Sequence, residues 1–141
     1  MSYATILLPV FVLIFLTFGL MIWMGFARGG ALKRGEARIP DIALGQANWP
    51  PRAQQISNSF PSQFQLPVLF YILTVLAMVT RQADYLFVVM AWLFVLARFL
   101  HVYIHTTSNY VRHRFNAFLV GAVILLAMWI IFAARILLAV Q

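Results

Sequence analysis

The chain has 141 residues, of which 64% are hydrophobic and only 9% are charged. Soluble domains carry about 25% charged residues, so this composition excludes an ordinary soluble domain and indicates an integral membrane protein. The net charge of +7 does not indicate a nucleic-acid partner, because the basic residues lie mostly between apolar runs, where they set topology and contact lipid headgroups. With no cysteine, the chain can form neither a disulfide nor a thiolate metal site.

The first predicted membrane span covers residues 3–26, which are almost wholly apolar and long enough to cross a core of about 30 Å. No basic segment precedes it and no small-residue cleavage site follows, so we expect a retained helix. A polar connection, residues 27–56, follows the span. Residues 31–38 of this connection are predicted to form a short helix on the membrane surface. The adjacent Pro50 and Pro51 exclude one continuous helix through it.

The second predicted span covers residues 58–80 and has an unusually polar beginning. Pro61 fits a first helical turn, with Ser59 as the N-terminal cap, whereas Pro67 lies deeper and should bend the helix. If the helix already includes residue 58, helical periodicity places three polar side chains on one face and points Gln63 away from it. The three are Asn58, Ser62 and Gln65.

The third predicted span, residues 85–105, ends in a run of polar side chains with helical spacing. The run consists of Arg98, His101, His105, Asn109 and Arg112, spaced by 3, 4, 4 and 3 residues. On a continuing helix these side chains share one face. Because polar groups inside a membrane are costly, this stripe predicts a functional site. A loop, residues 106–115, leads to the fourth predicted span, residues 116–138, in which Arg135 is expected to reach the far interface.

Four spans give an all-α, antiparallel four-helix bundle in which the two long loops share one side of the membrane. These loops carry seven basic residues against two acidic residues, so the positive-inside rule places them in the cytoplasm and both termini outside. The start of the second span then lies level with Arg98, His101 and His105, and with Asn116 of the fourth. The sequence therefore predicts a polar pocket that opens to the cytoplasm.

The sequence leaves several roles open for this stripe of polar side chains. Arg98 can hold a carboxylate or phosphate through a bidentate fork, or it can be a structural arginine that hydrogen-bonds helix carbonyls. His101 and His105 have a spacing that allows metal chelation, but no third ligand lies at their level, so we expect no metal. Several arginines near the loops could form a basic mouth for an anion or serve topology alone. They are Arg38, Arg52, Arg112 and Arg114.

The chain resembles the MAPEG family, the membrane-associated proteins of eicosanoid and glutathione metabolism, and its bacterial branch in particular. The resemblance rests on four short spans, a long first cytoplasmic loop, the entry at Asn58 with the run 65–71, and an arginine followed three residues later by a histidine. It extends from Arg98 through His101 and His105 to Asn109 and Arg114.

Membership would imply a homotrimer that binds glutathione between subunits near the cytoplasmic face and takes a lipophilic electrophile from the bilayer. By resemblance, Arg114 would lie near the thiol as the catalytic residue. The other residues would bind glutathione, and they are Asn58, Gln65, Arg98, His101, His105 and Arg52. The implied location is the bacterial inner membrane.

The sequence departs from the family pattern in the first turns of the second span. The family usually has a glutamate there, whereas this chain offers only Gln63 and Gln65, which cannot pair with an ammonium group as anions. His105 stands at about the position where the eicosanoid synthases have a tyrosine. We therefore expect a glutathione-dependent transferase or peroxidase. The alternative is a non-catalytic, lipid-binding or accessory subunit of a larger membrane complex. A small transporter is less favoured, since no broken-helix pair or repeat is present.

Overall fold

The computed structural model describes residues 1–45 and 48–139, and every regular element in this part of the chain is helical. Residues 46 and 47 of the predicted connection lie outside the described residues. Four helical stretches are long and apolar enough to cross a membrane, which supports an integral membrane protein. They are α1 (Tyr3–Lys33), the broken stretch Pro51–Val79, α5 (Tyr85–Thr106) and α6 (Val111–Ala139).

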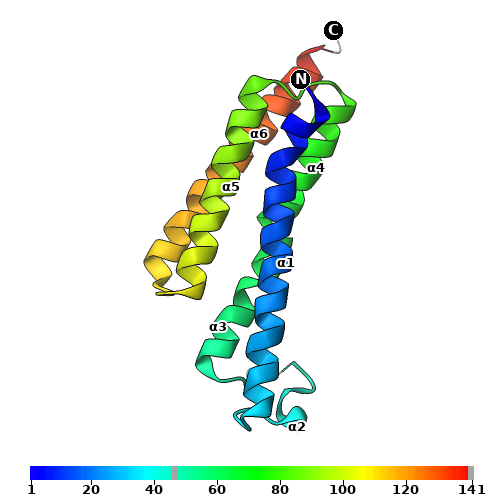
Figure 1. The fold of residues 1–141 in the computed structure, drawn as a ribbon. Helices are drawn as coiled ribbons and strands as arrows, with labels where there is room; N and C mark the ends of the chain where they lie inside the picture. The colour runs from blue at the N-terminus through cyan, green and yellow to red at the C-terminus, as the bar shows by residue number, and fades with distance from the viewer. Residues whose placement is uncertain (46–47, 140–141) are drawn as a thin grey trace.

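The four stretches run antiparallel (Figure 1). Both termini lie at one end of the bundle together with the turn between α4 and α5, and the turn between α5 and α6 lies at the other. α1 and α3 continue beyond that second turn and end near α2 (Ile39–Ile42), so the bundle has a two-helix extension on one side. Contacts are densest between α5 and α6, and α1 packs against α3, α5 and α4.

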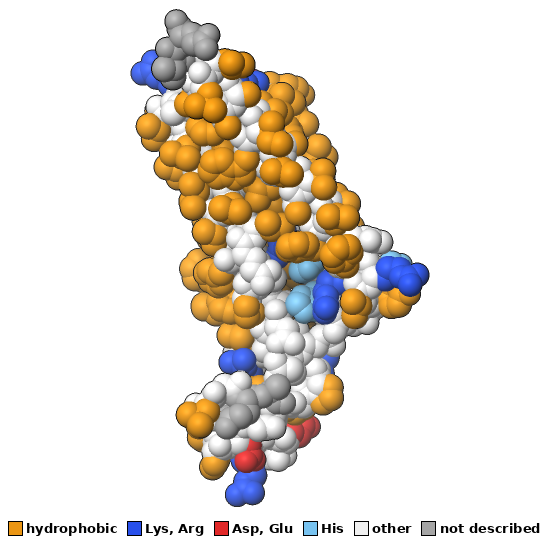
Figure 2. Space-filling model, turned by 180° about the vertical axis from the view of Figure 1, so that it is seen from behind, with side chains coloured by type: hydrophobic (Ala, Val, Ile, Leu, Met, Phe, Trp, Pro, Cys, Tyr) orange, Lys and Arg blue, Asp and Glu red, His pale blue; other side chains and the backbone are white. Residues whose placement is uncertain are grey.

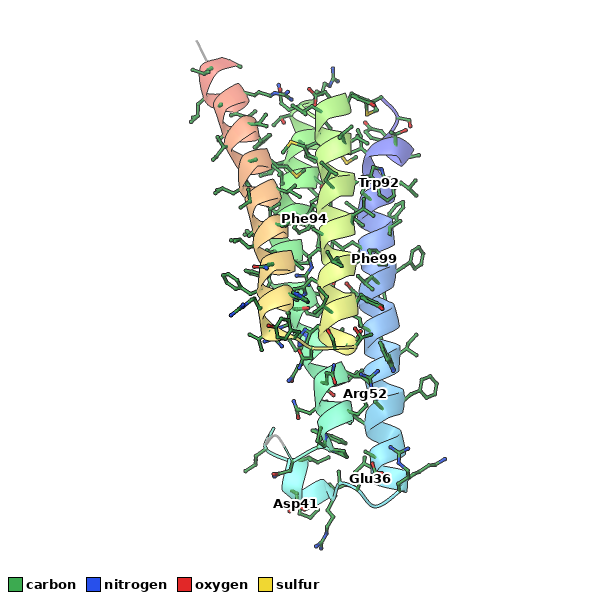
Figure 3. The ribbon with its side chains drawn as sticks, turned by 90° about the vertical axis from the view of Figure 1, so that its left-hand side faces the viewer. Glu36, Asp41, Arg52, Trp92, Phe94 and Phe99 are labelled. Atoms are coloured by element: carbon green, nitrogen blue, oxygen red, sulfur yellow. The ribbon has the colours of Figure 1, made fainter. Side chains whose placement is uncertain are left out.

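The core lies at the centre of these helices and is made of aliphatic and aromatic side chains. Phe70 of α4 and Phe94 of α5 are fully buried, and their rings stack with centroids 5.0 Å apart. Figure 3 shows Phe94 on the side of α5 that meets α6, whereas Phe99 lies on the side that meets α1. The outer faces of the helices carry exposed hydrophobic side chains, which cover most of the long helices on the face seen in Figure 2, and we call this surface the hydrophobic belt. Such a belt suits a lipid environment.

α1 is longer than the predicted span and absorbs part of the connection that follows. Residues 31–33 form its last turn, so the predicted separate helix at residues 31–38 is wrong. The chain turns at Gly35, whose φ of 72° suits glycine. In this turn Arg34 pairs with Glu36 at 3.0 Å, and its hydrogen bond lowers the pKa of the Glu36 carboxyl.

The second span is broken into three segments, each opened by a proline in its first turn. They are α3 (Pro51–Ser59), the 3₁₀ helix η1 (Pro61–Phe64) and α4 (Leu66–Val79). Two predictions are therefore wrong. Ser59 ends α3 and donates its hydroxyl to the Ile56 carbonyl at 2.6 Å instead of capping a helix start. Pro67 lies in the first turn of α4 instead of bending the helix.

α5 ends at Thr106, earlier than a continuous polar stripe requires. Asn109 adopts a left-handed φ of 50° in the turn that follows, so the helical face of Arg98, His101 and His105 does not extend to Asn109 and Arg112. That part of the stripe prediction is wrong. α6 begins at Val111, five residues before the predicted start at residue 116.

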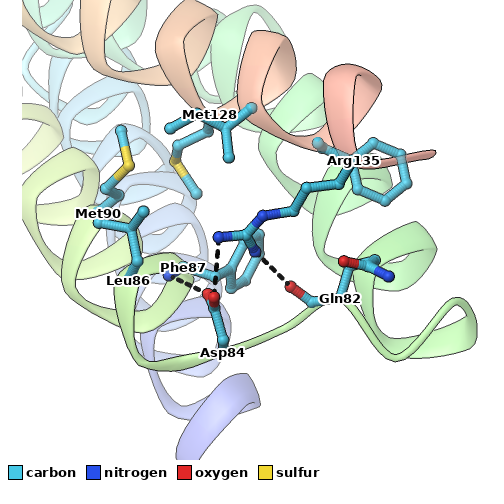
Figure 4. Close-up of a pocket in the computed structure, with 9 residues that line it drawn as sticks. Gln82, Asp84, Leu86, Phe87, Met90, Met128 and Arg135 are labelled. Atoms are coloured by element: carbon cyan, nitrogen blue, oxygen red, sulfur yellow. Dashed lines mark hydrogen bonds and ion pairs between the residues drawn. The ribbon is translucent and has the colours of Figure 1, made fainter. Parts of the chain in front are cut away.

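Arg135 does not simply reach toward the far interface, as the sequence suggested, but ties α6 to the turn before α5 (Figure 4). Its guanidinium forms an ion pair with Asp84 at 2.9 Å and donates to the Gln82 carbonyl at 3.3 Å. Asp84 also caps α5 by accepting from the Phe87 N–H at 3.0 Å. Burial acts to raise the pKa of Asp84, but the hydrogen bonds from Arg135 and Phe87 outweigh it, so that pKa is lowered.

Candidate functional site

A polar cavity of about 410 Å³ lies where α3, η1, α5 and α6 meet, near the end of the bundle opposite the termini. Figure 2 shows histidine and basic side chains in this hollow, at the edge of the hydrophobic belt. Ten residues line it: Asn58, Pro61, Ser62, Gln65, His101, His105, Val111, Arg114, Phe115 and Phe118. The cavity thus brings together five of the seven predicted site residues.

The two histidines form one wall of the cavity. His101 and His105 are 5% and 8% exposed, and their rings meet edge to face with centroids 5.7 Å apart. The Nδ1 atoms of both rings are buried without a hydrogen-bond partner in the described structure. His101 also packs against Phe118, with ring centroids 6.0 Å apart. Both histidines line the cavity, and a neutral imidazole ring carries one hydrogen-bond donor and one acceptor.

Arg114 brings a positive charge to the cavity. Its side chain is half-buried, and Nη1 donates to the Asn109 side-chain oxygen at 2.6 Å. The left-handed conformation of Asn109 places that oxygen where it can hold the guanidinium. The neighbouring Arg112 is exposed and does not line the cavity. Of these two nearby arginines, Arg114 therefore belongs to the site and Arg112 does not.

Arg98 lies behind the cavity wall. The side chain is 1% exposed, and Nη2 donates to both the carbonyl oxygen and the hydroxyl of Ser62, at 3.2 and 3.0 Å. Its Nε and Nη1 atoms have no hydrogen-bond partner in the described residues. Neither of the ion pairs found in the described chain involves Arg98, so its charge has no carboxylate partner there. Arg98 therefore contributes to the site through Ser62 and its electric field.

Arg52 does not line the cavity. It donates to the Thr106 carbonyl at the end of α5, and its guanidinium lies 5.6 Å from the centre of the Trp23 ring. The neighbouring Gln55 donates to the His105 and Thr107 carbonyls, both at 2.9 Å. α3 thus caps the C-terminal end of α5, where backbone carbonyls lack helical partners. Figure 3 shows Arg52 between α3 and α1, just below the end of α5.

The predicted polar face of the second span is formed in spite of the break in its helix. Asn58 ends up in the cavity from α3, Ser62 from η1 and Gln65 from the junction with α4. Gln63, the other candidate for the position of the family glutamate, faces the opposite way and lines a different cavity, as its orientation in the sequence predicted. Asn116 is exposed and lies outside the site, so that its predicted place in the pocket is wrong.

The cavity also contains an apolar wall that the sequence reasoning missed. Val111, Phe115 and Phe118 come from the first two turns of α6. Their spacing, with Arg114, is that of one helical face, and it would have revealed them had the helix been started at residue 111. Polar and aromatic surfaces therefore meet in one hollow.

The structure offers no cluster for a metal ion within the described residues. No group of three or more histidine, aspartate or glutamate side chains converges there. His113 is exposed and packs against Tyr110, with ring centroids 4.6 Å apart, instead of joining His101 and His105. The donors and cations that line the cavity suit an anionic or hydrogen-bond-accepting organic ligand better than a metal ion.

Comparison with known proteins adds the family. The family model described as "MAPEG family" matches residues 6–134, which is nearly the whole chain. Searches of the curated proteins and of the solved structures found no match. The matched region includes every residue of the polar cavity and all four membrane-spanning stretches except their outermost turns. The chain belongs to the MAPEG family.

Proposed function

We propose that this protein is a membrane enzyme that uses glutathione either to modify a lipophilic electrophile or to reduce a lipophilic peroxide. The observation that carries the proposal is the polar cavity at the edge of the hydrophobic belt. It presents a cation and two imidazole rings on one side and aromatic side chains on the other. MAPEG members include glutathione transferases and peroxidases, which agrees with this chemistry.

The positive charge at the cavity matches the carboxylates of the tripeptide. Glutathione carries two carboxylates and one ammonium group, so it is a net anion, and Arg114 and the buried charge of Arg98 favour it. When bound, glutathione supplies a nucleophilic thiol whose reactivity depends on its thiolate form. Arg114 is the cation that lines the cavity, and its charge would stabilise that thiolate. Asn58, Gln65, His101 and His105 would orient the peptide through hydrogen bonds.

Assembly as a homotrimer belongs to the same proposal. The apolar outer faces of α1 and α6 leave ample surface for contacts with other copies, and a neighbouring subunit would close the open side of the cavity. The basic loops would face the cytoplasm of a bacterial cell, with the protein in its inner membrane. Chemical cross-linking or native mass spectrometry of the protein in mild detergent should give a trimer. A stable monomer would contradict the intersubunit site.

The test of function is glutathione binding by purified protein in detergent. We expect saturable thermal stabilisation by glutathione, and ultraviolet absorbance of a thiolate at neutral pH. Arg114→Ala should weaken binding about tenfold to a hundredfold, the worth of hydrogen bonds to a charged group. Arg112→Ala is the matched control, because Arg112 is exposed and outside the cavity. Equal effects of the two substitutions would contradict the assigned role of Arg114.

A second candidate is a non-catalytic subunit that holds a lipid or a partner protein in the same fold. It is favoured by one observation: none of the described residues that line the cavity is acidic, so the ammonium group of glutathione has no anionic partner there. Absence of stabilisation at millimolar glutathione, with an intact trimer, would favour this second function. Stabilisation by glutathione together with turnover of a lipophilic electrophile would favour the enzyme.

A further inference from the structure

The chain has only three acidic side chains, Glu36, Asp41 and Asp84, and none of them lines the polar cavity. Figure 3 shows Glu36 and Asp41 at the far end of the two-helix extension, beyond the turn between α5 and α6. Asp84 lies in the turn before α5, at the opposite end of the bundle, where it pairs with Arg135 at 2.9 Å (Figure 4). Since all three belong to the described residues, a single chain brings no carboxylate side chain to the cavity.

Assembly with other copies of the chain leaves this property unchanged. Copies that share one orientation in a membrane are related by a rotation axis along the membrane normal, so each residue lies at the same depth in every copy. Every copy therefore keeps its acidic side chains at the two levels just described, one beyond the end of α5 and the other beside the termini. The cavity remains without a carboxylate at its own level in any oligomer of this symmetry.

Two positive charges act on the cavity with no carboxylate to balance them. Arg114 lines the cavity, and its hydrogen bond at 2.6 Å goes to the neutral amide of Asn109. Arg98 lies behind the wall and directs both of its hydrogen bonds to Ser62. Because a half-buried site screens charges less than water does, these two guanidinium groups attract the carboxylates of a ligand and repel an ammonium group.

The hydrogen-bond acceptors among the lining side chains are few, and most are already engaged. The side-chain oxygen of Asn58 accepts from Nε2 of Gln54 at 2.6 Å. The Ser62 hydroxyl accepts from the buried arginine and donates to a backbone carbonyl of α3. The Gln65 amide and the two imidazole rings remain, and all of them are neutral when the rings accept. An ammonium group has three donors and a full charge, so it would enter the cavity with no opposite charge to balance it.

We propose that the thiol favoured by this cavity carries carboxylates but no free ammonium group, its amine being acylated or absent. This inference rests on the proposed function and narrows the class of thiol that the site uses. Glutathione still fits through its carboxylates and its thiol, but its ammonium group weakens the binding. Gln65 determines this preference, because its amide lines the cavity with no competing hydrogen bond among the described residues, and a carboxylate in its place would pair with the ammonium group.

The test compares glutathione with glutaryl-cysteinylglycine, the same tripeptide with a hydrogen atom in place of its ammonium group. Isothermal titration calorimetry with the full chain in detergent at neutral pH gives the Kd of each thiol. We expect the analogue to bind about threefold to tenfold more tightly than glutathione. Gln65→Glu should reverse the order, so that glutathione binds about tenfold more tightly than the analogue. The matched control is Asn116→Asp, which adds the same charge at an exposed position outside the cavity and should change the ratio of the two Kd values by less than about twofold.

Two results would overturn the preference and leave the proposed function intact. They are binding of glutathione by the native chain that equals or exceeds binding of the analogue, and a ratio of Kd values that Gln65→Glu and Asn116→Asp change equally. If neither thiol binds, the proposed function fails and the preference fails with it. Correct assembly of each variant is checked by its elution profile. If Gln65→Glu does not fold, Asn58→Asp decides instead and should also favour glutathione, since Asn58 lines the cavity and an aspartate keeps the acceptor for Gln54.

Discussion

Arg98 of α5 donates two hydrogen bonds from one nitrogen to Ser62 of η1, one to the carbonyl oxygen and one to the hydroxyl. This contact holds the short 3₁₀ helix in the broken second span, at a point where the backbone bonds of a regular helix are interrupted. Because Ser62 lines the polar cavity, the shape of that cavity depends on a side chain behind its wall.

Replacing Arg98 by Met should therefore lower stability in detergent by about 1.5–3 kcal/mol, the range for hydrogen bonds to charged groups. Ser62→Ala should cost less, about 1 kcal/mol, because the carbonyl remains as an acceptor. Denaturant titration of the purified variants measures both. Unchanged or higher stability of Arg98→Met would instead mean that burying its charge costs more than its hydrogen bonds return.

A second prediction follows from the hydrogen bonds that α3 donates to the last carbonyls of α5. Arg52→Ala or Gln55→Leu should speed backbone hydrogen exchange at residues 103–109, because the last carbonyls of α5 lose their donors. A loss of local stability of about 1 kcal/mol for each is expected from the hydrogen bonds alone. Arg38→Ala is the matched control, since Arg38 is exposed and its side chain makes none of these contacts. Equal exchange in the Arg52 and Arg38 variants would contradict the cap.

Much of the fold was predictable from hydropathy, because long apolar stretches in a membrane protein form membrane-spanning helices. The all-helical class, the membrane location and the family were predicted and are confirmed. The predicted span 85–105 ends within one residue of α5 itself, whereas the contacts of Arg52 and Gln55 with the last carbonyls of α5 were not predictable, because these residues are about 50 positions away in sequence. No local pattern before Asn109 reveals such a contact.

Part of the site was also predictable from the sequence. Helical spacing correctly put His101 beside His105, and the antiparallel order brought them level with Asn58 and Gln65. The spacing failed for Arg112, since it assumed a helix through the turn at Asn109. Arg52 and Arg114 carry the same charge and both fall in predicted loops, at residues 27–56 and 106–115. Only their tertiary contacts show that one caps a helix and the other lines the cavity.

The Asp84–Arg135 ion pair predicts a pH dependence at the other end of the bundle. Folding lowers the pKa of Asp84, so the pair contributes stability above the unfolded pKa of about 3.9 and loses it as the pH falls through the folded pKa. The difference in stability between the native chain and Asp84→Asn should therefore disappear in acid. Because both side chains are partly exposed, the difference at neutral pH should be at most about 1 kcal/mol.

Asp84→Ala separates the cap from the ion pair. Asparagine can still accept from the Phe87 N–H, whereas alanine cannot, so Asp84→Ala should cost about 1 kcal/mol more than Asp84→Asn. Thermal melts of both variants from neutral to acidic pH measure this difference. A difference between native chain and Asp84→Asn that grows in acid would contradict the sign derived from the pKa.

Two glycines offer a matched test of packing. A Cβ at Gly121 would lie 3.7 Å from Ala97 and from Phe94, so Gly121→Ala should be tolerated, and should gain up to about 1 kcal/mol from helix propensity. Gly121→Leu should cost about 1–3 kcal/mol by overpacking the contact between α5 and α6. Gly19 has open space around it, so Gly19→Leu should be tolerated. A large loss in Gly19→Leu would show that another copy of the chain packs against that face of α1.

The cap on α5 also changes which positions can vary independently among relatives. Arg52 and Gln55 do not line the polar cavity, yet they hold the last carbonyls of α5, including that of His105, which does line it. A chain that alters either residue must find another way to end α5 or accept a different cavity. Sequence covariation in relatives should therefore link positions 52 and 55 to the segment 105–114 as strongly as it links the residues that line the cavity.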